Sequence, residues 1–416
     1  MRIGLIVIAL SICLLVRESF EAPAKSPLKI SISVSSSSVP TIDTAKTLSL
    51  AKSLSSHSWE WGTTIQASLE VNNPELSVFS TNAFPNGKVP IVSGTGQKID
   101  ALAYAKQKIQ TNGPALADGA GAIGDPASLG VGAILLGSAT STKNTIYKSA
   151  AQRQLNTVLA APKFYNGALS QRANVAELWA DNMFMTPPFL AYSAVAGNNV
   201  TLLRQAISQC ALYRQVLQAN TTSTWKGLWT HIVGQESQTL GIWATGNGWA
   251  ALGMVRVLAT VKNWQTSSSW SSEQGQLIQY ILEIINGAKA VPVDPQTGFY
   301  RNYIVGGSNS QNNNTVTWFG DGAGTAALTA AALRLAVIRP SLAPQMISFA
   351  KPLLTSLAKN TNNDGLLSPT VNPLDWYTTT PFTSGSPEGQ AFISMAGAAW
   401  RDCVNAGVCS STSRKS

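Results

Sequence analysis

The feature that most limits how this chain can fold is a sixfold recurrence of one kind of helix. Each copy is a run rich in Gly, Ala and Ser, apolar on all sides, that a polar residue opens. The opening residues are Glu60, Asp125, Asp181, Asn247, Asp321 and Glu388. Successive openings lie 65, 56, 66, 74 and 67 residues apart, which leaves room for a helix pair with its loops. Repetition of this kind predicts a solenoid or a closed ring.

The segments between these runs have a different pattern. Residues 199–220 and 271–290 alternate apolar and polar positions at helical spacing, which is typical of helices with one exposed face. We therefore expect an all-α fold, an (α/α)6 barrel of six inner helices ringed by six outer ones. The 416 residues, 44% hydrophobic and 12% charged, suit one large domain. In this arrangement the N-terminal ends of the inner helices gather at one mouth.

Tryptophans accompany the acidic openings. They are Trp59, Trp61, Trp179, Trp243, Trp249, Trp318 and Trp376. Each acid taken alone is explained by helix capping, and any one tryptophan by core packing. Together, flat apolar faces beside hydrogen-bonding groups suit a sugar ring. We expect a carbohydrate cleft at the mouth, with Trp179, Trp243 and Trp249 among its substrate-binding residues.

The N-terminal end has the three-part layout of a secretory signal. A short basic start precedes an apolar run over residues 3–16 and a small-residue stretch that ends at Ala24. We predict a signal peptide over residues 1–24, a Ser/Thr/Pro-rich leader over 25–47 with one strand in 28–34, and the barrel over 48–416. A membrane anchor is the alternative, but the run is shorter than a spanning helix needs. The Asn-x-Ser/Thr triplets at Asn199, Asn220 and Asn313 are compatible with a secreted, extracellular glycoprotein.

Cysteine usage and charge set further limits. Cys403 and Cys409 are close enough to close a small loop, and Cys210 sits in an apolar run typical of a buried residue. The net charge of +9 is spread without a Lys/Arg cluster, so we expect no nucleic-acid partner. We expect an oligosaccharide substrate, no membrane association after signal removal, a monomer, no metal and no cofactor.

Three motifs carry a family resemblance. The runs LWADNMFMTPPFLA, GLWTH and GIWATGNGWAALGMVRVL, beginning at residues 178, 227 and 241, resemble the unsaturated rhamnogalacturonyl and glucuronyl hydrolases of glycoside hydrolase families 105 and 88. The resemblance extends from about Trp59 to Trp400. It implies a six-hairpin glycosidase that acts on 4,5-unsaturated uronic acids at the ends of oligosaccharides of pectin or rhamnogalacturonan type. An aspartic acid protonates C4 of the vinyl ether, water adds at C5, and the glycosidic bond is lost as the hemiketal opens.

The resemblance also assigns roles. Asp181 matches the catalytic acid, Asp125 matches a second, assisting aspartate, and His231 matches a substrate-site histidine. The Met-rich and aromatic neighbours of Asp181 give the low-polarity setting that general acid–base catalysis favours.

One departure concerns the substrate carboxylate. The family usually has an arginine where this chain has Thr245, just before Asn247, and both positions are substrate-binding candidates. Either Lys226 or Arg301 supplies the missing charge, or Thr245 and Asn247 bind a neutral group. Two further alternatives stay open: an inverting glycosidase that uses Asp125 and Asp181 with water between them, and a sugar-binding protein without catalysis.

Overall fold

The computed structural model describes residues 41–219, 225–305 and 318–409. They belong to one compact unit that begins at Val39. The predicted signal peptide and the strand expected over residues 28–34 lie outside the described residues, as do Asn220 and Asn313. Within the described ranges, no helix is long and apolar enough to cross a membrane.

Six helical segments form a closed inner ring. They are α2 (Ser58–Asn72), α4 (Gly124–Ala127) with α5 (Gly130–Gly137), α7 (Asn182–Ala196), α9 (Ala244–Asn263), α11 (Gly322–Ile338) and α13 (Pro387–Asn405). The short α4 and α5 are two halves of one inner helix. Each segment packs on the next in chain order, and α13 packs on α2, so that the ring closes. Every sequence-predicted inner helix is therefore present.

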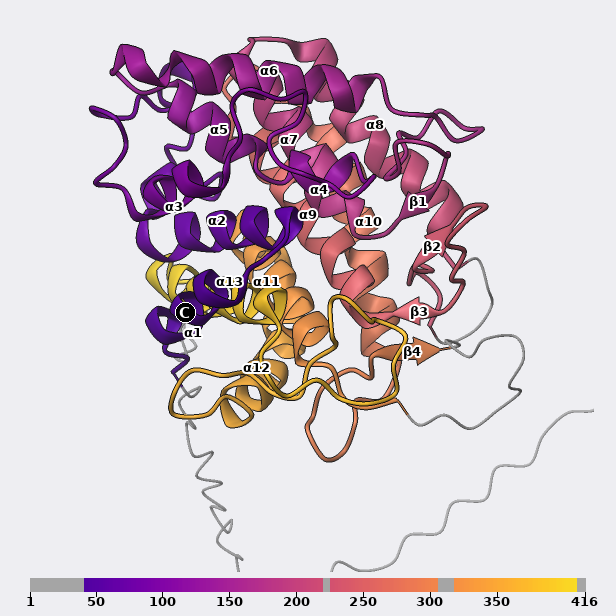
Figure 1. The fold of residues 1–416 in the computed structure, drawn as a ribbon. Coiled ribbons are helices and arrows are strands. Elements are labelled where there is room, and N and C mark those ends of the chain that lie inside the picture. The colour runs from indigo at the N-terminus through magenta and orange to yellow at the C-terminus, as the bar shows by residue number, and fades with distance from the viewer. Residues whose placement is uncertain (1–40, 220–224, 306–317, 410–416) are drawn as a thin grey trace, which may run out of the picture. The chain divides into compact units, whose positions relative to one another are not determined.

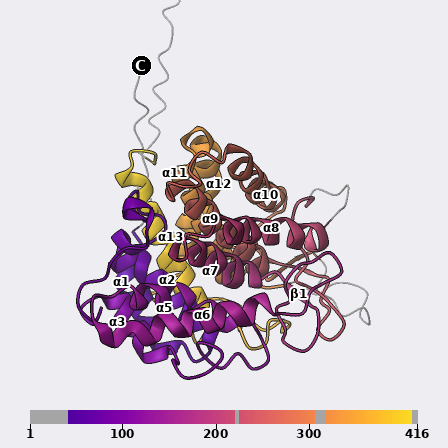
Figure 2. The same cartoon turned by 90° about the horizontal axis from the view of Figure 1, so that it is seen from above.

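Six outer helices surround this ring (Figure 1). They are α1 (Thr44–Leu54), α3 (Asp100–Lys108), α6 (Thr145–Leu159), α8 (Val200–Leu217), α10 (Ser271–Lys289) and α12 (Ala343–Lys359). α8 and α10 lie side by side on one flank, outside α7 and α9 (Figure 2). The structure is the (α/α)6 barrel that the repeat predicts. Its first helix starts at Thr44, however, so the expected domain boundary at residue 48 falls inside α1. Thr47, just before that boundary, is buried, and its hydroxyl lies 2.6 Å from that of Ser394 on α13.

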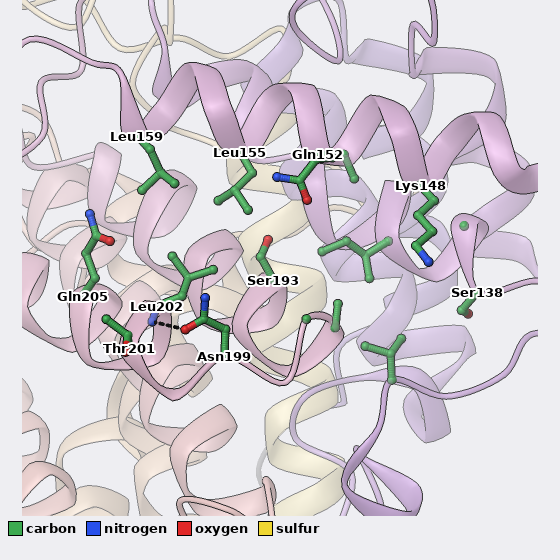
Figure 3. A pocket seen from close by; sticks show the side chains of 16 residues that line it. Ser138, Lys148, Gln152, Leu155, Leu159, Ser193, Asn199, Thr201, Leu202 and Gln205 are labelled. Atoms are coloured by element: carbon green, nitrogen blue, oxygen red, sulfur yellow. Dashed lines mark hydrogen bonds between the residues drawn. The ribbon is translucent and has the colours of Figure 1, made fainter.

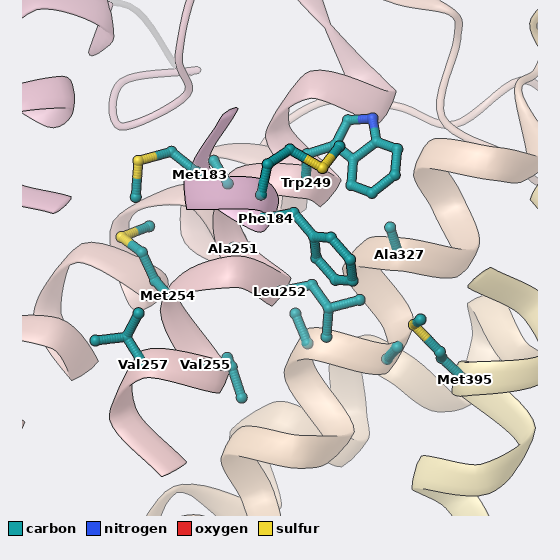
Figure 4. Close-up of a cluster of buried hydrophobic side chains, with 14 of the residues drawn as sticks. Met183, Phe184, Trp249, Ala251, Leu252, Met254, Val255, Val257, Ala327 and Met395 are labelled. Atoms are coloured by element: carbon teal, nitrogen blue, oxygen red, sulfur yellow. The ribbon is translucent and has the colours of Figure 1, made fainter. Parts of the chain in front are cut away.

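The inner helices are apolar on all sides because each is packed on all sides. Met183 and Phe184 of α7 meet Trp249, Leu252 and neighbouring residues of α9 in the centre of the barrel (Figure 4). Pro187 of α7 has no N–H to donate to the carbonyl of Met183, one turn earlier. Gly253 of α9 approaches that carbonyl so closely that a Cβ there would lie 2.0 Å from its oxygen. A glycine is therefore required where α9 crosses α7.

A buried ion network crosses the barrel towards the C-terminal ends of the inner helices. Glu70 of α2 receives bonds from Arg256 of α9 and from Arg334 of α11, the latter at 2.7 Å. Arg334 also donates to Asp402 of α13 at 2.5 Å. Since α2 and α9 are opposite members of the ring, Glu70 links helices that do not touch along the ring. The network holds four of the six inner segments together.

Short strands and turns fill the connections. β1 (Leu178–Trp179) pairs antiparallel with β2 (Ile232–Val233), so that Trp179 faces Ile232, and β3 (Ile242–Trp243) pairs antiparallel with β4 (Tyr303–Val305). β1 and β3 lead directly into α7 and α9. Single 3-10 turns span Pro74–Leu76, Pro85–Gly87, Thr142–Asn144 and Pro340–Leu342. The two small sheets thus fix the approach to two inner-helix N-termini.

The cysteine predictions are confirmed. Cys403 and Cys409 form a disulfide at the end of α13. Cys210 is a buried free thiol on α8, and burial raises its pKa.

Candidate active site

The N-terminal ends of the inner helices meet at a cavity of about 150 Å³. Three carboxylic acids, one amide and five tryptophans line it, with Met185, Pro373 and Leu374. The acids are Asp125, Asp181 and Glu388, the amide is Gln171, and the tryptophans are Trp59, Trp179, Trp243, Trp249 and Trp376. These residues come from α2, α4, α7, α9, α13 and the loops before them. The cavity is the mouth that the parallel arrangement of inner helices predicts.

Asp181 stands at the N-cap position of α7 but does not cap it, since its side chain accepts no bond from the first turn. Its carboxyl is 18% exposed, and Oδ1 lies 3.6 Å from Nε2 of His231. The pairing of β1 with β2 sets this distance, because Ala180 N–H donates to the carbonyl of His231 at 2.9 Å. Asp181 is thus held beside His231 by this backbone bond, and its partly exposed carboxyl can meet a ligand.

His231 is buried and held from three directions. Its Nδ1 lies 3.1 Å from the hydroxyl of Tyr303. Its ring packs on Trp243 with centroids 4.2 Å apart, and Trp376 meets it edge-on at 5.5 Å. These contacts fix the ring so that Nε2 points at Asp181.

Asn302 fixes two of the cavity tryptophans. It is fully buried, accepts a bond from Trp243 Nε1 at 2.8 Å, and donates to the carbonyl of Trp376 at 2.9 Å. The loop before α13 that carries Trp376 is thereby attached to the start of α9. Trp179, whose ring meets that of Trp376 edge-on with centroids 5.6 Å apart, donates to Glu177 at 3.0 Å. Glu177 also accepts bonds from the backbone N–H groups of Glu236 and Ser237. Burial alone would raise the pKa of Glu177, but these hydrogen bonds outweigh it and lower the pKa.

Asp125 lies in α4 and accepts a bond from Gln171 Nε2 at 2.6 Å. Burial, with a smaller contribution from the charge of Asp181, raises the pKa of Asp125 to about 7, against the opposing effects of Gln171 and Arg172. A carboxyl with such a pKa exchanges a proton near neutral pH, which is the property that acid–base catalysis requires.

Glu388 is the third acid, in the first turn of α13. It is 2% exposed. Burial raises its pKa well above the ordinary value, the charges of Glu60, Asp181 and Asp321 add to this effect, and a hydrogen bond with Trp59 opposes it. Glu388 therefore holds its proton in conditions where an exposed glutamate has lost it.

Four buried polar atoms around the cavity have no hydrogen-bond partner. They are Asp181 Oδ1, His231 Nε2, Gln171 Oε1 and Glu388 Oε1. Buried polar groups in folded proteins are nearly always paired, and exceptions at one place call for an explanation. Donors and acceptors grouped around a Trp-lined hollow match the hydroxyls and C–H faces of a sugar. No group of three or more His, Cys, Asp or Glu among the described residues is arranged to hold a metal ion.

The structure does not bring Thr245 and Asn247 into the cavity, which corrects their expected role in substrate binding. Both are fully buried. Thr245 donates to Asp321 at 2.6 Å. The Asn247 amide accepts from Trp229 N–H and donates to the carbonyls of Trp229 and Trp243. Their polar atoms form hydrogen bonds within the protein. These two residues therefore support the structure around the site and do not line the cavity.

The other predicted residues do meet at this place. Asp125, Asp181, Trp179, Trp243 and Trp249 line the cavity, and His231 contacts Asp181. Sequence reasoning omitted Gln171, Trp376 and Glu388 from the site. Glu388 had a usable signal, because it opens the sixth repeat. Trp376 is one of the seven tryptophans noted near the openings, but its loop position did not single it out. Gln171 also lies in a loop, and nothing in its local sequence marks it.

A larger cavity, of about 540 Å³, lies elsewhere, between α6 and the junction of α7 with α8 (Figure 3). Leu155, Leu159 and Leu202 give it an apolar wall, and Lys148 is its one charged residue among those described. It adjoins the C-terminal end of α7, whereas Asp181 marks the N-terminal end. It contains no carboxyl group among the described residues, so it is not the catalytic candidate despite its size.

Comparison with known proteins agrees with this assignment. The helix-pair ring and its acidic, tryptophan-lined mouth define a glycoside hydrolase with the six-hairpin barrel. Residues 101–399 match Glycosyl Hydrolase Family 88, and the chain belongs to that family. No curated protein sequence matched the chain.

Solved structures share the fold at low sequence identity. A family 105 glycoside hydrolase from C. acetobutylicum ATCC 824 is 14% identical with a TM-score of 0.64, over 86% of this chain and 99% of that one. A possible family 105 member from Salmonella enterica serovar Paratyphi A is 16% identical with a TM-score of 0.61, over 86% and 93% of the two chains. An unsaturated glucuronyl hydrolase specific for heparin is 12% identical with a TM-score of 0.55, over 87% and 96%.

Proposed function

We propose that this glycoside hydrolase removes 4,5-unsaturated uronyl groups from the ends of oligosaccharides, with Asp181 as its general acid. The observation that carries the proposal is the unpaired Oδ1 of Asp181, which faces His231 at 3.6 Å beside a tryptophan-lined cavity. Membership of Glycosyl Hydrolase Family 88 supports the reaction class. The heparin-specific neighbour named an unsaturated glucuronyl hydrolase supports the substrate class.

The reaction proceeds by hydration of a vinyl ether. Asp181 donates a proton to C4, which leaves a cation at C5 that the ring oxygen stabilises. Water then adds to C5 and returns its proton to Asp181. The hemiketal at C5 opens, the bond between C1 and the glycosidic oxygen breaks, and the remaining oligosaccharide leaves as an alcohol. One carboxyl group is acid in the first step and base in the second.

Neighbouring residues support this exchange. His231 lies beside Asp181, and the contacts that fix its ring keep Nε2 directed at the Asp181 carboxyl. Asp125, with its pKa of about 7, is able to exchange a proton with the attacking water. Tryptophans supply the stacking surface and limit the entry of bulk water.

The test is ultraviolet spectroscopy of lyase-digested polysaccharides. We expect loss of the C4=C5 absorbance with the wild type, and a rate lower by about 10²- to 10⁴-fold with Asp181→Asn. Asp118→Asn is the matched control, since Asp118 is exposed and lies outside the cavity. Folded wild-type protein that leaves the absorbance unchanged on rhamnogalacturonan, glucuronan, ulvan-type and methyl-esterified pectin digests contradicts the proposal.

The proposed function also includes where the protein acts. We propose that residues 1–24 direct secretion, that the mature chain starts at Lys25, and that the enzyme meets pectin-type fragments outside the cell. N-terminal sequencing of the protein recovered from culture medium tests this. Retention of Met1 in a protein that stays within cells overturns it.

A further inference from the structure

The candidate active-site cavity has an unusual charge balance for an enzyme that takes uronates. Its lining contains Asp125, Asp181 and Glu388, and no Lys or Arg among the described residues. The two internal segments that the structure does not describe, residues 220–224 and 306–317, contain no Lys or Arg either. No basic side chain of the barrel wall is thus placed to receive a carboxylate in this cavity.

The basic residues considered for that task are engaged elsewhere. Arg301 donates to the carbonyl of Trp318 at 2.7 Å and lies 3.4 Å from Asp294. Lys226 is exposed and adjoins Gly287 of the outer helix α10. Arg172 is outside the lining: its guanidinium lies against Gly121, and its charge acts on Asp125.

His231 does not replace an arginine. Its Nδ1 is occupied by Tyr303, and its Nε2 faces the carboxyl of Asp181. Nε2 is therefore directed at Asp181, and His231 is not part of the cavity lining. A substrate carboxylate would enter beside three acids without a cation of its own, and a buried charge without a partner is strongly disfavoured.

The rest of the lining suits an apolar substituent. Met185 and Trp249 are buried, while Pro373, Leu374 and Trp376 form the side contributed by the loop before α13. A methoxy group placed against thioether, aliphatic and aromatic surface gains apolar contact and needs no ionic partner. The unpaired polar atoms of the cavity remain for the ring hydroxyls and for the ester carbonyl.

We propose that the uronyl group taken by this cavity is uncharged, namely the methyl ester of a 4,5-unsaturated uronate. This inference rests on the proposed function and narrows its substrate to the ends produced by a lyase that cleaves esterified polyuronate. The reaction is unchanged. Asp181 protonates C4, water adds at C5, and the bond between C1 and the glycosidic oxygen breaks, while both C–O bonds of the ester stay intact.

Two disaccharides that differ only in the methyl ester provide the test. At neutral pH we expect a KM about tenfold or more lower for the ester than for the free acid, because only the free acid brings an unpaired charge. Leu374→Arg, at an exposed position of the lining, should lower the ratio of the free-acid KM to the ester KM at least several-fold, because the added charge pairs only with the free acid. Leu374→Gln is the matched control without charge.

The outcomes separate the two proposals. A KM for the free acid equal to or below that for the ester, in a wild type that hydrolyses both, overturns the inference and leaves the proposed function standing. A fall in the ratio of the two KM values for Leu374→Gln as large as that for Leu374→Arg also overturns it, since charge is then not the cause. Failure to hydrolyse either disaccharide overturns the proposed function and the inference with it.

Discussion

At the scale of single residues, the six polar openings share a position but not a task. Asp321 caps α11 with its side chain, accepting from Ala323 and Gly324. Glu60 accepts from the backbone of Ser56 and His57, just before α2. Asp181 makes no such bond and keeps an unpaired oxygen. What distinguishes a catalytic candidate from a cap is therefore the set of bonds that it does not make.

Asp125 gives a prediction at this scale. Its pKa is about 7 in the folded chain against an ordinary 3.8, so the folded state keeps a proton that the unfolded state loses between about pH 4 and pH 7. Stability should fall as pH rises through this window, and the full cost is present above pH 7. Asp125→Asn removes this cost and still accepts from Gln171. We expect the variant to be more stable than wild type at pH 8 by on the order of 2 to 4 kcal/mol, and comparable at pH 3.5.

Urea unfolding at the two pH values measures the difference. Asp118→Asn, at an exposed position, should show no such dependence on pH. A stability difference for Asp125→Asn that is the same at pH 3.5 and pH 8 would contradict the assignment.

At the scale of the elements, α9, α11 and the loop before α13 meet at one buried carboxyl group. Asp321 accepts from Thr245 of α9 and from Val371 N–H of the loop, besides capping its own helix. Its burial raises its pKa, which these hydrogen bonds oppose. The position of Trp376, further along the same loop, depends on this junction. Thr245 thus affects the site indirectly, through its hydrogen bond with Asp321.

Removing the Thr245 hydroxyl tests this role. Thr245→Val leaves Asp321 without one of its four bonds in a buried setting, which should lower the free energy of unfolding by about 1 to 3 kcal/mol. Thr245→Ser keeps the hydroxyl and should lose less. The KM should change little in either variant, because the hydroxyl does not reach the cavity. A raised KM for Thr245→Val at unchanged stability would show direct contact with substrate.

At the scale of the whole molecule, the candidate active site and the buried ion network lie at different ends of the inner helices. The N-terminal ends of the inner helices hold unpaired polar atoms and the cavity. Deeper along the same helices, the buried charges form ion pairs: Glu70 joins α2 to Arg256 of α9 and Arg334 of α11 across the interior. An unsatisfied site is tolerated at one end because the other end and the apolar core hold the ring closed.

Breaking that network gives the prediction for this scale. Glu70→Gln leaves two buried arginines facing a neutral amide, and loss of one partner from a buried ion pair typically costs about 3 to 5 kcal/mol. We expect a loss of that order in chemical denaturation. Asp43→Asn, which alters the exposed pair with Lys46 at 3.9 Å, should change stability by less than about 1 kcal/mol. Equal effects of the two substitutions would contradict the role given to the network.

The sequence by itself determined the architecture. Inner and outer helices differ in where their apolar residues fall. This pattern is local, and it recurs in each of the six repeats. It also placed Asp125, Asp181 and Glu388 at one mouth, since parallel inner helices bring their starts together. The family resemblance of the GLWTH motif identified His231, and Trp179, Trp243 and Trp249 were identified because they lie next to those starts.

The tertiary structure decided which of these polar groups remain available. Asn247 and Thr245 look as exposed to a ligand in the sequence as Asp181 does, but their partners, Trp229 and Asp321, come from other turns of the chain. Trp376 and Gln171 reach the cavity on loops whose course depends on distant contacts such as Asn302 and Asp125. Hydrogen-bond satisfaction and loop placement depend on residues far apart in the chain. The local sequence pattern therefore cannot predict either of them.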